Sequence, residues 1–151
     1  MTPIRMTMIA AVAACAYAGT GLAADTMPKD QYKTEKQRIE ADGKSAREKC
    51  KGMSANAKDV CMAEAKGNEK VAKAELEAKQ KDTAKARYDL AVAKSDMTYN
   101  VAKEKCDDLK GNDNKACTKD AKAAHDQAKK QARADRDGAD GKKDRTAKSS
   151  K

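Results

Sequence analysis

Large hydrophobic residues are sparse beyond the N-terminal segment of this chain, and they recur at the spacing of one helical face. Four positions follow one another at intervals of seven residues: Tyr32, Ile39, Ala46 and Met53. Side chains at this spacing return to the same face of an α-helix, whereas the two-residue alternation of a strand is absent. The pattern predicts a helix over about residues 30–51.

The same kind of stripe continues through the middle of the chain. A helix beginning near residue 57 places Cys61, Ala65, Ala72 and Leu76 on one face. No residue between 57 and 109 compels a break, so one uninterrupted helix and two helices with a joint both remain open. A joint at residues 81–83 is favoured, because Asp82 or Thr83 is suited to cap the next helix. A last helix is expected over about residues 113–135.

The chain contains one segment twice. Residues 47–66 and 103–122 align without a gap and are identical at seven of twenty positions: Glu48/Glu104, Lys49/Lys105, Cys50/Cys106, Asn56/Asn112, Cys61/Cys117, Ala65/Ala121 and Lys66/Lys122. Each copy has two cysteines eleven residues apart, with turn-forming residues between them. We interpret each copy as a helical hairpin joined by a disulfide.

Turn-forming residues support this interpretation in both copies. In the second copy, Gly111 suits the left-handed conformation past a helix end, and Asn112 is expected to cap the following helix. In the first copy, Gly52 interrupts the helix, and Asn56 with Asp59 resembles a capping box. The turns therefore separate two helices in each repeat.

Composition limits the size of the core. The chain has no Phe or Trp, and 38% of its residues are charged. That leaves too little apolar surface for a conventional core, although alanine and lysine form helices well. We predict an all-α fold of tandem disulfide-stapled helical hairpins, extended and with little core: residues 25–82, residues 83–135, and a disordered basic tail at 136–151.

Residues 1–24 have the three parts of a secretory signal peptide. A short basic start precedes a small apolar stretch, and small residues form two competing cut sites, after Ala18 and at Ala23 or Ala24. The apolar stretch is too short for a comfortable membrane span. We expect cleavage at the second site. One alternative is a bacterial lipobox ending at Cys15, whose lipidation would make Cys15 the mature N-terminus, and the other is that the segment is retained as an anchor.

Four cysteines remain after cleavage: Cys50, Cys61, Cys106 and Cys117. An even number in an exported chain implies two disulfides, and the repeat favours pairing within each copy. There is one alternative pairing. If each eleven-residue span were continuous helix, its two cysteines would share one face, and two such helices packed antiparallel would form Cys50–Cys117 and Cys61–Cys106. A metal site is disfavoured, because ligand pairs usually lie about two to four residues apart.

No residues form a catalytic pattern. Ser54 lacks the context of a nucleophile elbow, C-x-x-C is absent, and the acidic residues alternate with lysines as on a solvated, ion-paired face. The sole histidine, His125, has no recognisable triad partner and is expected to be exposed to solvent. We therefore expect no catalytic, cofactor-binding or metal-binding residues, and no enzyme.

The positive charge has two interpretations. The formal net charge is +9, and residues 119–151 hold eleven basic and six acidic residues. A basic helical protein can bind polyanions through phosphate contacts and counterion release, and the other interpretation is a solvated lysine-rich surface. Few tyrosines and no duplex-reading motif argue against a single-strand stacking platform and against sequence-specific nucleic acid.

The segments EKCKGMSANAKDVCMAEAKG, EKVAKAELEAK and YNVAKEKCDDLKGN resemble a family of small, Lys/Ala-rich periplasmic proteins of Gram-negative bacteria. Its members are often labelled TolA-like or cell-envelope biogenesis proteins, and the resemblance covers about residues 32–126. The resemblance implies a periplasmic compartment and supplies no site residues.

These observations lead to one expected function and two alternatives. We expect an exported, non-enzymatic periplasmic or cell-envelope protein that acts by binding or scaffolding, with an envelope protein or an anionic envelope polymer as its partner. The alternatives are a small periplasmic stress chaperone and a polyanion-binding protein, with lipopolysaccharide or nucleic acid as the polyanion.

Overall fold

Four helices account for nearly all of the described chain. The computed structural model describes residues 27–149, with side chains as far as residue 141. The helices are α1 (Lys29–Cys50), α2 (Ala55–Lys81), α3 (Ala84–Cys106) and α4 (Gly111–Ser149). The predicted signal peptide, Cys15 and the last two residues lie outside the described residues.

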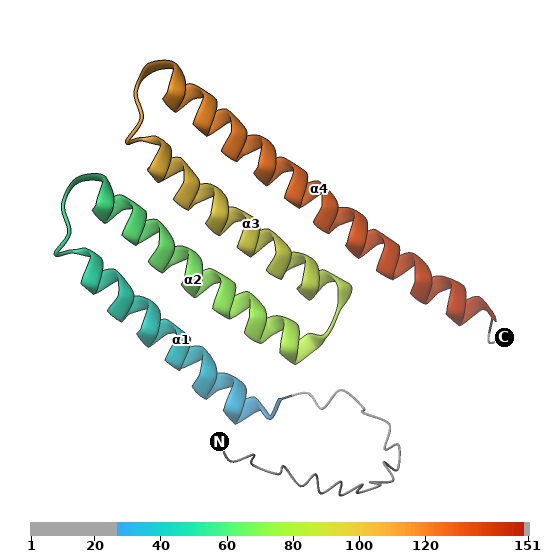
Figure 1. The fold of residues 1–151 in the computed structure, drawn as a ribbon. Helices are drawn as coiled ribbons and strands as arrows, with labels where there is room; N and C mark the ends of the chain where they lie inside the picture. Colours follow the sequence, from blue (N-terminus) through green and yellow to red (C-terminus); the bar gives the residue numbers. More distant parts are fainter. Residues whose placement is uncertain (1–26, 150–151) are drawn as a thin grey trace, which may run out of the picture.

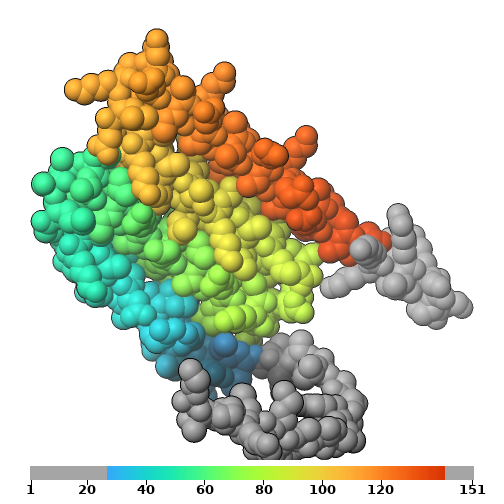
Figure 2. Space-filling view, in the orientation of Figure 1, coloured from blue at the N-terminus to red at the C-terminus, as the bar shows by residue number. Residues whose placement is uncertain are grey.

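The helices form a single open layer. Each helix packs only against its neighbours in sequence, in the pairs α1–α2, α2–α3 and α3–α4, and within the described residues α1 and α4 share no contact. Figures 1 and 2 show the four helices side by side, and no other described element packs on either broad face of the layer. The all-α prediction of two stapled hairpins with little core is thereby confirmed.

A joint separates α2 from α3, so the alternative of one uninterrupted central helix is wrong. Asp82 adopts a left-handed conformation with φ of 40° and ends α2. The next residue, Thr83, caps α3 by accepting a hydrogen bond from the backbone N–H of Ala86 at 3.1 Å. Asp tolerates the left-handed region better than most residues, and Thr is a preferred N-cap.

Buried side chains are few and mostly small. Among the side chains of residues 27–141, only those of Cys50 and Cys106 are buried almost completely, and these residues are 1% and 0% exposed. The other buried hydrophobic residues are Ile39, Ala65, Leu76, Ala84, Ala86 and Ala132. Small residues let neighbouring helices approach closely, and at Gly67 the space that a Cβ would occupy is taken by the side chain of Met97. Packing therefore depends on close helix contact more than on large side chains.

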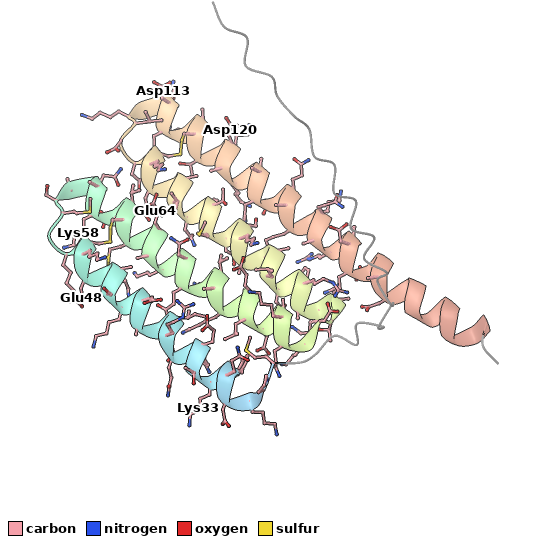
Figure 3. All side chains as sticks on the ribbon, turned by 60° about the horizontal axis from the view of Figure 1, so that its bottom comes forward. Lys33, Glu48, Lys58, Glu64, Asp113 and Asp120 are labelled. Atoms are coloured by element: carbon pink, nitrogen blue, oxygen red, sulfur yellow. A yellow bond between two sulfur atoms is a disulfide. The ribbon has the colours of Figure 1, made fainter. Side chains whose placement is uncertain are left out.

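Charged side chains project from the helices along the whole layer (Figure 3). Several form ion pairs between neighbouring helices: Arg47–Glu69 and Glu40–Lys73 between α1 and α2, and Glu75–Lys94 and Glu64–Lys105 between α2 and α3. Isolated exposed pairs contribute little, roughly 0–1 kcal/mol each. Glu69 differs because its carboxylate contacts two cations, Lys73 at 2.8 Å and Arg47, and is only 15% exposed.

Glu69 is expected to make the stability of the first hairpin sensitive to acid. Hydrogen bonds from Lys73 and then Arg47 lower the pKa of Glu69 below its ordinary value of 4.5. A lowered folded-state pKa stabilises the protein above the unfolded-state value, and this stabilisation is lost as the pH falls through the folded-state pKa. In Glu69→Gln, we expect the free energy of unfolding to be lower near neutral pH, by about 1 kcal/mol, and to fall less below pH 4.5.

Urea titrations at several pH values measure this difference. Glu64→Gln is the control for the loss of one carboxylate, because Glu64 makes a single ion pair at 3.8 Å. Parallel pH profiles of Glu69→Gln and the unsubstituted protein would contradict the expectation.

The last helix is longer than the sequence pattern indicates. A disordered tail was predicted from Arg136, whereas α4 continues to Ser149. Arg136 itself is anchored, because its guanidinium lies 4.7 Å from the centroid of the Tyr88 ring in α3. Each glycine in this segment lowers the stability of the helix by only about 1 kcal/mol relative to alanine. The Ala, Lys, Arg and Asp residues of the segment are compatible with a helix.

Candidate functional site: two disulfide-clamped loops

Two disulfides fix the two hairpins at the same end of the layer. They join Cys50 to Cys61 and Cys106 to Cys117, with Cα–Cα distances of 5.6 and 5.7 Å. The predicted pairing within each repeat is confirmed, and the crosswise pairing is not observed. The loops that they close lie at one end of the layer, opposite the α2–α3 joint (Figure 1).

The two clamps are structurally equivalent. In each, the first cysteine is the last residue of a helix and the second lies two turns into the next helix. We call the four-residue loops between these helices tip 1 (residues 51–54) and tip 2 (residues 107–110). Both contain the same backbone hydrogen bond, from Met53 to Cys50 at 3.1 Å and from Leu109 to Cys106 at 2.9 Å.

The residue that follows each tip is left-handed in both copies. Gly111 has φ of 62°, as its sequence position predicts, and the equivalent residue Ala55 has φ of 49°. Glycine adopts this conformation readily, whereas alanine does so at a cost of about 1–2 kcal/mol. The shared conformation, retained despite this cost at Ala55, shows that both tips have the same backbone path.

Asn56 has a different role from the predicted capping box. The N-cap of α2 is Ser54, and the Asn56 side chain donates a hydrogen bond to the carbonyl of Glu104, 2.7 Å away on α3. The prediction from the sequence was wrong because it considered only local partners, and Glu104 lies 48 residues further on. Asn56 therefore connects the first repeat to the second.

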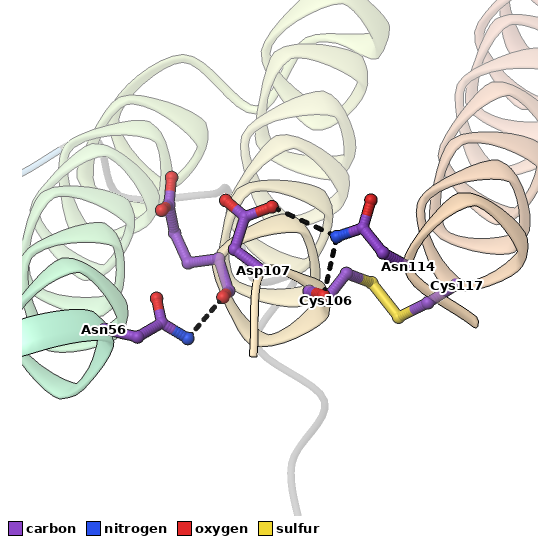
Figure 4. Close-up of a disulfide and its surroundings, with 6 residues drawn as sticks. Asn56, Cys106, Asp107, Asn114 and Cys117 are labelled. Carbon is purple, nitrogen blue, oxygen red and sulfur yellow. Dashed lines mark hydrogen bonds between the residues drawn. A yellow bond between two sulfur atoms is a disulfide. The ribbon is translucent and has the colours of Figure 1, made fainter. Parts of the chain in front are cut away.

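Asn114, and not Asn112, makes the corresponding contact from α4. Since α4 begins at Gly111, Asn112 lies inside the helix and not at its cap. Asn114 donates to the carbonyl of Cys106 at 2.8 Å and lies 3.4 Å from a carboxylate oxygen of Asp107 (Figure 4). The C-terminus of α3 thus receives side-chain amides from both neighbouring helices. They add to the turn hydrogen bonds that these two carbonyls accept from the backbone N–H groups of Asp107 and Leu109.

Substitution of Asn56 is expected to weaken the contact between the repeats. Asn56→Ala leaves the Glu104 carbonyl without its side-chain donor, and a typical hydrogen bond of this kind contributes about 1 kcal/mol. Asn112→Ala is the matched control, because Asn112 is its exposed repeat equivalent, for which we expect a change within about 0.5 kcal/mol. Equal effects of the two substitutions on urea unfolding would contradict this assignment.

The sequence predicted a solvent-exposed His125, and this prediction is wrong. The side chain packs between α3 and α4. It is 15% exposed, its ring stacks on Tyr99 with a centroid distance of 4.8 Å, and Nε2 lies 2.6 Å from Asp96. Ser95 donates to the backbone carbonyl of His125, at 3.4 Å, and not to the ring. His125 therefore makes a packing contact. Ser95 does not point at its imidazole, as the serine of a catalytic Ser–His pair would.

The described residues offer neither a metal site nor a membrane-spanning helix. They contain no group of three or more His, Cys, Asp or Glu residues arranged to hold a metal ion. None of the helices described is long and apolar enough to cross a membrane.

The comparisons with known proteins returned no relative. No protein-family model matches the chain, and neither a curated protein nor a solved structure is significantly similar to it.

Proposed function

We propose that this chain is an exported cell-envelope protein that acts by binding or scaffolding and catalyses no reaction. The observation that carries the proposal is the pair of disulfides, each closing one hairpin. Structural disulfides persist in oxidising compartments and are rare in reducing ones. The N-terminal sequence, with the parts of a signal peptide, supports the same compartment.

The shape of the molecule supports binding as its mode of action. A single layer of helices that contact only their neighbours resembles a short repeat array, and such arrays present extended surfaces to partners. The two disulfides hold tips 1 and 2 in place at one end of this layer. Rigid scaffolds that hold exposed loops are a common arrangement in binding proteins.

Mass spectrometry of the protein expressed in a Gram-negative host tests the compartment. In a periplasmic fraction, we expect an intact mass without residues 1–24 and non-reduced peptides that join Cys50 to Cys61 and Cys106 to Cys117. An added lipid mass on a chain beginning at Cys15 would support export with a lipid anchor instead of a free N-terminus. A full-length chain with four free thiols in the cytoplasmic fraction would overturn the proposal.

A second candidate function, polyanion binding, is favoured by the outer side of α4. Among the described helices, α4 has a neighbour on one side only. Its exposed surface carries a row of basic residues: Lys115, Lys119, Lys122, Lys130 and Arg133. Among the described residues, only Lys122 of these five forms an ion pair, with Asp126. Unpaired cations along one helix suit phosphate groups on an anionic polymer.

Lipopolysaccharide binding tests this candidate. Replacing Lys115, Lys119 and Lys130 by Gln is expected to weaken binding by about 100-fold at low salt, at about 1 kcal/mol for each lysine near an anionic surface. The matched control replaces Lys33, Lys36 and Lys44, which are exposed on α1. Equal loss in both triple variants, or an affinity that does not fall with salt, would remove polyanion binding by α4.

A further inference from the structure

Each tip presents one large hydrophobic side chain to solvent. Met53 in tip 1 is 46% exposed and Leu109 in tip 2 is 44% exposed, and they are the only large hydrophobic residues that are exposed in the described part of the chain. They occupy equivalent positions in the two repeats, 56 residues apart in the sequence. Only seven of the twenty repeat positions are identical, yet both copies have a large hydrophobic residue at this exposed position.

Packing within the molecule does not account for these two residues. Leu76 is buried, and Leu90, Met62 and Met97 are at least half-buried between helices. Large hydrophobic side chains are scarce in this chain, yet one is placed at each tip, beyond the last turn of a helix. Exposed apolar residues on a rigid support are typical of binding surfaces.

The clamps hold both side chains in a fixed arrangement. Each lies three residues after a buried disulfide cysteine and is held by the backbone hydrogen bond to that cysteine. The tips themselves are held relative to each other by the packing of α2 against α3 and by the hydrogen bond from Asn56 to the Glu104 carbonyl. Contacts on a preorganised surface lose less conformational entropy on binding.

We propose that tips 1 and 2 together bind one amphipathic helix of a partner protein, which lies across the end of the layer and contacts Met53 and Leu109. This inference rests on the proposed function and names the kind of partner. The tips are two interhelical spacings apart, roughly 16–20 Å at the usual 8–10 Å. In a helix, residues eleven apart are separated by about 16 Å and share one face.

The charges of the tips set the direction of the bound helix. Tip 1 contains Lys51, which pairs with Glu48 at 2.8 Å and lies near the exposed Lys49, whereas tip 2 contains Asp107 and Asp108 beside Lys110. A helix has a partial positive charge at its N-terminus and a partial negative charge at its C-terminus. The partner helix therefore places its N-terminal end over Leu109 and its C-terminal, acidic end over Met53.

A second copy of this chain fits the tips less well. A two-fold contact would place Met53 against Leu109 of the other copy, but it would join the two molecules through four-residue loops alone. Stable interfaces bury at least about 1,200 Å². A helix lying across both tips also covers the first turns of α2 and α4, so it contacts more of the same surface.

Fluorescence anisotropy with the purified, oxidised protein tests the proposal. The probe is a labelled helical peptide with leucines eleven residues apart, an acidic C-terminal end and a basic N-terminal end. We expect Met53→Ser and Leu109→Ser each to weaken binding by about 10-fold or more. The conservative variants Met53→Leu and Leu109→Met are expected to retain it, and so is Ala134→Ser on α4. All five substitutions are at exposed positions.

Control peptides and sedimentation complete the test. A peptide with its leucines four residues apart, or with its charged ends exchanged, is expected to bind at least about 10-fold more weakly. Equal binding of all peptides, or no effect of the serine variants, would overturn the proposal. So would self-association of the protein alone that both serine variants abolish, because the tips would then bind a second copy.

The two proposals fail independently in these experiments. Peptide binding is measured on purified protein, so its absence leaves export and the disulfides, measured by mass spectrometry, unaffected. Conversely, protein found in the cytoplasm with free thiols would overturn the proposed compartment, whatever the peptides show.

Discussion

Removal of the Cys106–Cys117 disulfide, by replacing both cysteines with alanine, is expected to lower the free energy of unfolding by about 3 kcal/mol. In the chain-entropy model, a crosslink that closes a loop of this length restricts the unfolded chain by about that amount, and the two cysteines are eleven residues apart. The same change at Cys50 and Cys61 is expected to have a similar effect. Both losses together approach the whole stability of a small domain, about 5–15 kcal/mol.

Circular dichroism during urea titration measures this effect. The variant with four alanines is expected to lose most of its helical signal at 37 °C, and the unsubstituted protein under reducing conditions is expected to behave in the same way. Replacing cysteines in pairs avoids unpaired thiols, which would form wrong disulfides. Unchanged helicity and an unchanged urea midpoint in the four-alanine variant would show that the disulfides do not stabilise the fold.

Gly67→Leu is expected to destabilise the contact between α2 and α3 by about 3 kcal/mol. A Cβ at residue 67 would lie 2.9 Å from the Cβ of Met97, closer than such atoms approach. The Cβ of Met97 moves only with its backbone, so rotation of the side chain leaves this contact in place and the two helices have to separate. Overpacking of this kind usually costs about 1–3 kcal/mol, occasionally more, and outweighs the gain in helix propensity.

Gly138→Leu is the matched control for this substitution. Nothing lies within 4 Å of the position of a Cβ at Gly138 in α4, so only the gain in helix propensity remains, about 0.8 kcal/mol. Combining Gly67→Leu with Met97→Ala removes the Cγ and Sδ of Met97, which also occupy this space, but keeps its Cβ, so we expect it to restore only part of the lost stability. Destabilisation by both leucine substitutions alike would contradict this explanation.

The repeat carries most of what the sequence predicts correctly. The cysteine spacing and the turn residues between the cysteines predicted two local disulfides, and Gly111 was recognised as left-handed. The joint at Asp82 and Thr83 was favoured for its capping residues, and the structure has it there. These features depend on residues within one turn or one hairpin, where local stereochemistry decides the outcome.

Features that depend on a distant partner could not be predicted. Asn56 looked like a local cap but bonds to α3, and His125 looked exposed but packs on Tyr99. Arg136 lies over Tyr88, on another helix, and α4 continues past the predicted end at Asp135. In each case the sequence shows the polar side chain and not the helix that lies beside it, because sparse hydrophobic residues leave the packing order of the helices undetermined.

Packing only between consecutive helices has a consequence for how the chain reaches its folded state. Each described helix finds its partner in the next helix along the sequence, so the relative contact order of this part is low and we expect it to fold fast. The N-terminal hairpin has its own α1–α2 contact and its own disulfide, so it can begin to form before α3 is available to pack on α2. The second hairpin then adds to an existing template, as a new unit does in a growing solenoid.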